Sequence, residues 1–186
     1  AKFRVPAVHV ALQAVLAMYA AGRTTGITLD SGHSVTHAVP IYEGHSLPHA
    51  VMSAELGGAD VTDHLIELLT ERGVALVTDA ERDVAERAKR ELAYVAADFG
   101  EEMARATETK EVEREFDPMS GAVFRLNDER FRCAELLFQP GLRGGAGREH
   151  TMGMHELVFE SIVACDRSIR QHLWRSVTLA GASSNA

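Results

Sequence analysis

The sequence predicts a domain of mixed α/β or α+β class. Two β-rich runs, residues 24–30 and 35–42, flank a short turn at residues 31–34, which is the pattern of a β-hairpin. A stretch from residue 81 to about residue 106 carries apolar side chains at helical spacing. Because strands and helices are mixed along the chain, both kinds of element are expected to share one core.

The N-terminal part of the chain is expected to be helical before the hairpin begins. Apolar residues recur at helical spacing over residues 8–21, and Gly22 lies where such a helix would end. In the hairpin, Pro40 indicates that the second strand ends there or lies at a sheet edge, because proline cannot donate to the ladder. Residues 43–50 have the composition of a turn.

Two helices are predicted in the middle of the chain. The first covers residues 61–72, with Asp60 as its cap. The start of the second is indicated by the capping-box pair Thr78 and Glu81, and this helix is expected to continue without a break to about residue 106.

The rest of the chain is predicted to alternate between short strands, loops and helices. These elements are two strands around residues 112–116 and 122–126 with a turn at 117–121, a glycine-rich loop at 141–147, helices at 156–165 and 167–174, and a final strand at 177–180.

Composition excludes several classes of protein. Hydrophobic residues make up 46% of the 186 residues and charged residues 25%, which is typical of a globular domain rather than of a disordered chain. The formal net charge of −8 argues against nonspecific binding to nucleic acid, which requires a basic face. No stretch approaches the ~18 apolar residues of a membrane span, so no membrane insertion is expected. Two cysteines, Cys133 and Cys165, and the lack of a signal peptide fit a reducing compartment.

Several runs of residues resemble actin. Their order and spacing follow actin along nearly the whole chain, so the resemblance is specific. The runs are GRTTGI at 22–27, DSG at 30–32, VTH at 35–37, VPIYEG at 39–44, LTERG at 69–73, YVA at 94–96, ERFRC at 129–133 and LFQP at 137–140.

The resemblance implies part of the actin-like ATPase fold, which is ribonuclease H-like. The chain is similar to the centre and the C-terminal part of actin, and is therefore expected to be a fragment of such a protein. Residues 1–20 would be a remnant of the first lobe. Residues 21–56 and 146–186 would form the core of the second large lobe, subdomain 3, and residues 57–145 would form the inserted subdomain 4.

The resemblance also implies a site for Mg-ATP or Mg-ADP in a cleft between lobes. Small residues in a tight turn let backbone N–H groups converge on an anion. The turn that resembles the second phosphate loop of actin consists of Ser31, Gly32, His33, Ser34 and Val35. Asp30 resembles the acid that contacts magnesium through water. Gln13 and His37 match the residues that position the attacking water, so these three are the catalytic candidates.

On the adenosine side, the resemblance implies contacts from four further residues, namely Gly58, Lys89, Gly181 and Ala182. Local sequence alone leaves other interpretations open. Asp-Ser-Gly is a common turn. Gln13 would be an ordinary polar helix residue, His37 a structural histidine, and Lys89 part of a solvated helix face.

The sequence departs from actin at the residues that would surround the nucleotide. His33 and Ser34 stand where actin has aspartate and glycine, Arg90 where it has glutamate, and Ala182 where it has a second glycine. These changes remove two carboxylates, restrict a flexible backbone and add a methyl group. We therefore expect weak or absent ATP turnover.

Two functions of different classes follow. The first is an actin-like cytoskeletal protein of the cytoplasm, whose full-length form binds Mg-ATP and assembles into filaments or an actin-related complex. Its partners would be copies of itself, other actin-family subunits and actin-binding proteins. The alternative is a truncated, catalytically inactive interaction module or a decayed paralogue.

Overall fold

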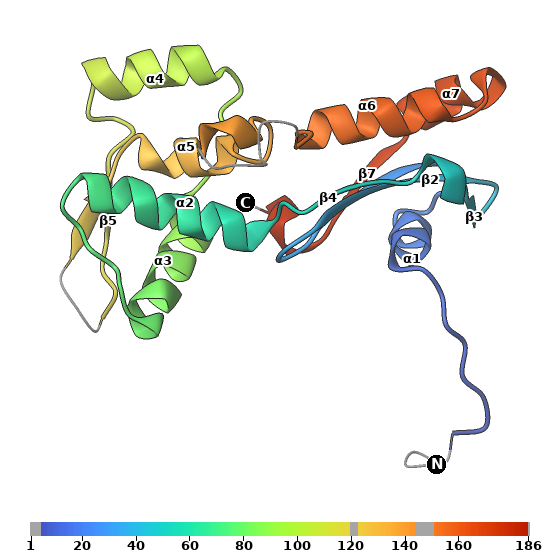
Figure 1. Ribbon diagram of the computed structural model, residues 1–186, viewed down its shortest axis with the longest axis horizontal. Coiled ribbons are helices and arrows are strands. Elements are labelled where there is room, and N and C mark those ends of the chain that lie inside the picture. The colour runs from blue at the N-terminus through green and yellow to red at the C-terminus, as the bar shows by residue number, and fades with distance from the viewer. Residues whose placement is uncertain (1–4, 120–122, 144–150, 186) are drawn as a thin grey trace.

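The structure is a computed structural model that describes residues 5–119, 123–143 and 151–185. A mixed sheet forms its centre (Figure 1). Strands β1 (Gly26–Ser31) and β2 (Thr36–Tyr42) pair antiparallel, which confirms the predicted hairpin. Strand β7 (Val177–Ala180) pairs parallel with β1, so the last predicted strand is also confirmed.

Two short strands that were not predicted extend this sheet, the first of them within the predicted turn at residues 43–50. Strands β3 (His45–Ser46) and β4 (Met52–Ala54) both pair antiparallel with β2, and the 3₁₀ turn η1 (Pro48–Ala50) lies between them. Strand β3 closes a tight hairpin with β2, in which Tyr42 is opposite His45. Strand β4 pairs with β2 from further along the chain, with Ala54 opposite Thr36, and this contact is not encoded by the composition of residues 43–50.

Side chains of the sheet alternate between two covered faces, because successive residues of a strand point to opposite sides. Helix α1 (Gln13–Ala20) packs on one face, where Ala14 and Met18 form a small core with Val39 and Ile41. The hydroxyl of Thr28 donates a 3.0 Å hydrogen bond to the carbonyl of Ala14 and fastens the start of the helix to β1.

Helices α6 (Met154–Ala164) and α7 (Arg167–Trp174) cover the opposite face, as Figure 1 shows. Leu157 and Ile162 are fully buried there with Ile27 of β1. The Ser161 hydroxyl donates a 2.7 Å hydrogen bond to the carbonyl of Ala50, which joins α6 to the η1 turn. The two predicted C-terminal helices are confirmed, the first beginning two residues earlier than expected.

The remaining helices gather beyond one end of the sheet (Figure 1). They are α2 (Gly58–Glu71), α3 (Asp79–Leu92), α4 (Phe99–Glu108) and α5 (Glu129–Glu135). Strands β5 (Arg114–Phe116) and β6 (Phe124–Leu126) form a separate antiparallel pair near the two predicted strands. The predicted turn and glycine-rich loop fall partly on residues 120–121 and 144–147, which lie outside the described residues.

The prediction of one helix over residues 81–106 is wrong. The capping box is present, because Glu81 N donates to Thr78 Oγ1 at 3.3 Å and Thr78 N donates to Glu81 Oε2 at 2.8 Å. The helix nevertheless stops at Leu92, and Asp98 caps a new one. Tertiary packing explains the break, because the rings of Tyr94 and Phe99 each lie 5.8 Å from that of Phe131 on α5.

Two other predicted helix starts need correction. Helix α2 begins at Gly58, and Asp60 is its third residue, whose carboxylate accepts a 3.0 Å hydrogen bond from Gly57 N. Helix α1 begins at Gln13 rather than near residue 8, and the preceding residues 5–12 are exposed and non-helical. Their β-branched valines disfavour a helix, and no neighbour within the described part of the chain buries them.

No helix among the described residues is long and apolar enough to cross a bilayer.

Candidate functional site

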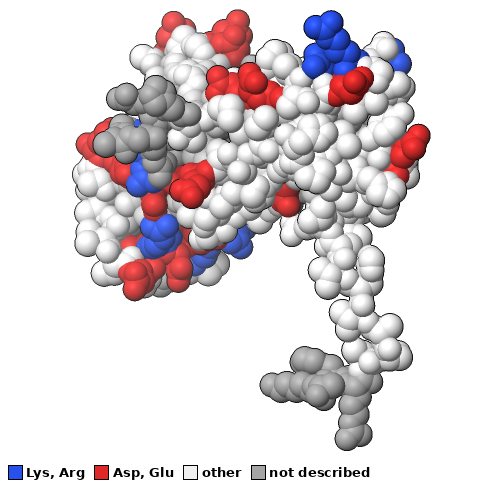
Figure 2. Space-filling model, turned by 45° about the vertical axis from the view of Figure 1, so that its right-hand side comes forward, with Lys and Arg blue, Asp and Glu red and all other residues white. Residues whose placement is uncertain are grey.

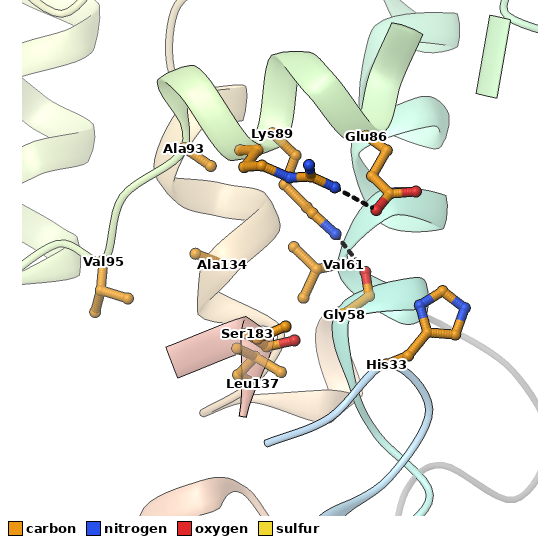
Figure 3. A pocket seen from close by; sticks show the side chains of 12 residues that line it. His33, Gly58, Val61, Glu86, Lys89, Ala93, Val95, Ala134, Leu137 and Ser183 are labelled. Carbon is orange, nitrogen blue, oxygen red and sulfur yellow. Dashed lines mark hydrogen bonds and ion pairs between the residues drawn. The ribbon is translucent and has the colours of Figure 1, made fainter. Parts of the chain in front are cut away.

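A cavity of about 460 Å³ lies where α2, α3 and α5 meet the turn after β1 and the end of the chain (Figure 3). Its size is within the range of small-molecule sites. One part of its wall is apolar and another carries charge. The lining residues are His33, Gly58, Val61, Glu86, Lys89, Arg90, Ala93, Val95, Ala134, Leu137, Ala182 and Ser183.

Lys89 is held in place by neighbouring backbone and hydroxyl groups. Its Nζ donates to the carbonyl of Gly58 at 2.8 Å and to Thr62 Oγ1 at 2.7 Å. Burial lowers the pKa of Lys89, because a buried ammonium group loses hydration. An ammonium group has three N–H donors, so one remains available for a ligand.

Arg90 and Glu86 form an ion pair at the cavity. The guanidinium Nη2 lies 2.9 Å from Glu86 Oε1, and the two residues are one helical turn apart on α3. Arg90 is largely exposed and Glu86 partly so, and water therefore screens the attraction. This pair is one of the two interactions drawn in Figure 3.

The turn after β1 directs its carbonyl groups toward α2. Gly32 O accepts hydrogen bonds from Gly58 N at 3.0 Å and from Ser183 Oγ at 2.9 Å. His33 O accepts from Ala59 N at 2.7 Å. The first N–H groups of α2 are therefore occupied. Both His33 and Ser34 are exposed residues, and within the described part of the chain their backbone N–H groups have no acceptor, so the turn itself offers donors to an anion.

Ser31 and Val35, at the two ends of the turn, are less exposed than His33 and Ser34 between them. The Ser31 hydroxyl is buried and lies 3.1 Å from Thr36 Oγ1, which in turn donates to Leu56 O at 2.7 Å. Val35 is half-buried, and its carbonyl accepts from Gly32 N at 3.0 Å. Both residues shape the turn through these bonds.

Gly181 lies where the chain passes closely over the end of β1. Its φ of +91° is in the region that favours glycine. A Cβ at this position would lie 2.7 Å from Asp30 Oδ1 and would collide with the carbonyl of Ser31. The next residue, Ala182, lines the cavity, so this close approach brings the last 3₁₀ turn, η3 (Ala182–Asn185), to the site.

The three catalytic candidates share one face of the sheet but do not line the cavity. Asp30 and His37 are register partners on β1 and β2 and therefore point to the same side. Thr28, two residues before Asp30, contacts α1, so this is the face that α1 covers. Gln13 is the exposed first residue of α1, next to Ala14. The sheet thus places all three on one side, with Asp30 half-buried and His37 exposed.

The donor set fits a nucleotide better than a resident metal ion. An apolar wall with lysine, arginine and backbone N–H donors suits a base and an anionic group. Magnesium prefers oxygen ligands. In the described ranges no three histidine, cysteine, aspartate or glutamate side chains cluster as metal ligands. Asp30 would be a single carboxylate, and every other ligand would have to come from water or phosphate.

The chain was compared with models of known protein families. The model described as Actin matches residues 1–186, the whole chain. This chain belongs to the actin family. The mixed sheet with helices on both faces agrees with a partial actin-like fold.

The cavity gathers residues that are far apart in this actin-family chain. Of the predicted nucleotide contacts, four line it: His33, Gly58, Lys89 and Ala182. Gly32 and Ser34 flank His33, and Gly181 precedes Ala182. Three of the four departures from actin, at His33, Arg90 and Ala182, therefore converge on one cavity.

Sequence reasoning missed several residues of the site. Glu86 could have been found as the i−4 partner of Arg90 on a predicted helix. Ser183 carries no local signal, because its role depends on the distant carbonyl of Gly32. The apolar wall consists of Val61, Ala93, Val95, Ala134 and Leu137, which are indistinguishable in sequence from core residues.

Proposed function

We propose that this chain is part of an actin-like cytoskeletal protein that binds an adenine nucleotide in the cavity and hydrolyses ATP weakly or not at all. The observation that carries the proposal is the convergence of His33, Gly58, Lys89 and Ala182 on one cavity. Family membership makes ATP or ADP the first ligands to test. A cytoplasmic, cytoskeletal location belongs to the same proposal.

The apolar and the polar parts of the cavity wall would contact different parts of the ligand. A base would be buried against the apolar side chains, including Val61 and Leu137, and the remaining N–H of Lys89 would reach a polar atom of the ligand. Phosphate groups would be directed to the free N–H groups of His33 and Ser34.

Slow hydrolysis follows from the residues available to orient water. Water would be held by hydrogen bonds from Gln13, at the start of α1, and from His37, whose register partner on β1 is Asp30. Ser34 has less backbone freedom than glycine, and His33 provides no carboxylate for a metal-bound water. Weak positioning of water is the reason for the low expected rate.

Equilibrium dialysis of the 186-residue chain with ATP, ADP and GTP tests the proposal. We expect saturable binding of the adenine nucleotides, weakened about tenfold by Val61→Asp, which places a charge in the apolar wall. Val77→Asp is the matched control, because Val77 is 86% exposed. Circular dichroism checks that each variant is folded.

Two results would count against the proposal. If no adenine nucleotide binds the folded chain, the cavity is not a nucleotide site, and the alternative of a catalytically inactive interaction module is preferred. If the chain releases phosphate rapidly from ATP and Asp30→Ala abolishes the release, weak turnover is wrong.

Self-association is the second part of the proposed function. The rings of Phe159 and Trp174 lie 6.1 Å apart, and the two residues are 50% and 47% exposed. They line a groove together with Met152, His155 and two glutamates, Glu156 and Glu160. Figure 2 shows a surface with few charged side chains across the middle of the molecule, between groups of acidic and basic residues. Exposed aromatic pairs of this kind favour protein contacts.

Analytical ultracentrifugation checks this part. We expect concentration-dependent association that is weakened by Phe159→Ser, and unchanged by Val123→Ser, which alters another exposed apolar residue. A monomer at all concentrations would contradict self-association.

A further inference from the structure

We propose that the cavity takes its nucleotide free of a divalent cation, with protein donors at His33, Lys89 and Arg90 compensating the phosphate charge. This inference rests on the proposed nucleotide binding and specifies the charge state of the ligand. It follows from the side chains of this chain and not from the family pattern.

The first argument is the balance of ionisable side chains in the wall. The lining contains two cationic side chains, Lys89 and Arg90, a histidine, His33, and one carboxylate, Glu86. That carboxylate is already paired with Arg90 at 2.9 Å. A divalent cation entering the cavity would therefore meet an excess of like charge, whereas a free phosphate would meet opposite charge.

The second argument is the number of unused donors. Lys89 Nζ makes two hydrogen bonds, to Gly58 O and Thr62 Oγ1, and keeps a third N–H. A guanidinium has five N–H donors, and Arg90 uses only part of this set for Glu86. Guanidinium groups bind phosphate with two parallel hydrogen bonds. The cavity can therefore satisfy phosphate oxygens directly.

The third argument is the position of the remaining carboxylate. Asp30 does not line the cavity, and its Oδ1 lies beside Gly181. Magnesium binds through carboxylates together with phosphates and keeps several waters. Because Asp30 lies outside the cavity wall, a magnesium ion in the cavity would gain little binding energy from the protein. The ion would also weaken the attraction between the phosphate groups and the basic residues.

Binding of ADP and ATP to the folded chain, measured by equilibrium dialysis in excess MgCl₂ and in excess EDTA, tests the inference. We expect equal or tighter binding in EDTA, by up to about tenfold. His33→Asp should reverse this preference, because it exchanges a basic side chain for a magnesium-binding carboxylate. His49→Asp is the matched control, because His49 is exposed on η1 and lies outside the cavity wall.

The outcomes separate this inference from the function on which it rests. Binding in MgCl₂ that weakens about tenfold or more in EDTA would overturn metal independence and leave the nucleotide site intact. An unchanged magnesium preference in folded His33→Asp would also overturn the role of His33. Absence of binding in both buffers would overturn the nucleotide site itself, and this inference with it.

Discussion

The ammonium nitrogen of Lys89 lies 2.8 Å from the carbonyl oxygen of Gly58. This bond connects the last turn of α3 to the first residue of α2. Gly58 also donates its N–H to Gly32 O at 3.0 Å, so one glycine links α3, α2 and the turn after β1. A change in α3 can therefore reach the exposed turn residues, His33 and Ser34, through a single residue.

Replacing Lys89 tests this connection. Lys89→Met keeps the aliphatic chain but removes two hydrogen bonds from a charged donor. Such bonds contribute about 1.5–3 kcal/mol each, so we expect the free energy of unfolding to fall by about 3 kcal/mol or more. Urea denaturation measures the change. Lys110→Met, at an exposed position, should alter stability by less than about 0.5 kcal/mol, and equal effects of the two substitutions would contradict the prediction.

Comparing substitutions at Gly181 and Gly73 tests the close approach of the chain at Gly181 to the end of β1. Both have positive φ, +91° and +87°, but no atom lies within 4 Å of a Cβ added at Gly73. Gly73→Ala should cost about 1 kcal/mol from backbone strain alone. Gly181→Ala adds a collision with Ser31 O, so we expect a loss of about 2–4 kcal/mol and weaker nucleotide binding. Thermal or urea unfolding that gives equal losses would refute the close approach.

The ion pair between Arg72 and Glu129 should be important for attaching α5 to α2. Glu129 is 1% exposed, and its Oε1 lies 2.7 Å from Arg72 Nη1. Its other oxygen accepts from Asn127 N at 2.7 Å. Arg72→Met would leave a buried carboxylate without its cation, with an expected loss of about 2–3 kcal/mol in urea unfolding.

Two further variants make that prediction specific. Arg175→Met, at an exposed arginine with no side-chain bond among the described residues, should leave stability unchanged. The double variant Arg72→Met with Glu129→Gln should be more stable than Arg72→Met alone, because the unpaired charge is removed. If the loss in the double variant equals the sum of the losses in Arg72→Met and in Glu129→Gln alone, the pair is not coupled.

His64 should make the fold sensitive to mild acid. Burial lowers the pKa of His64. The charges of Arg132 and Arg143 lower it further, whereas Glu67 raises it. A histidine in the unfolded chain has a pKa of about 6.5. Below that pH the unfolded state therefore binds more protons than the folded state, whose pKa is lower. Stability is therefore unaffected above this value and decreases as the pH falls toward the lowered pKa of the folded state.

The slope of stability against pH measures this effect. Between about pH 7.5 and about pH 5.5, His64→Gln should lose less stability than the unsubstituted chain. His172→Gln, which changes an exposed histidine, should keep the original slope. Identical slopes for all three proteins would show that His64 contributes no acid sensitivity.

Elements whose signals lie within a few neighbouring residues were predictable from the sequence. The hairpin of β1 and β2, the Thr78–Glu81 capping box and the last strand all depend on local propensity, capping or alternation. Predictions failed where distant contacts decide. The break after Leu92 and the unpredicted helix α5 depend on packing of Tyr94 and Phe99 against Phe131.

The candidate site shows the same division. The sequence by itself determined the family and the chemical character of His33, Lys89 and Arg90, because both depend only on residue identities and their order. Only the tertiary structure decided that these residues share one cavity, that Glu86 is paired with Arg90, and that Ser31 is buried. The physical reason is that the cavity wall combines the turn after β1, three helices and the end of the chain, and burial and hydrogen-bond partners arise only when these segments pack together.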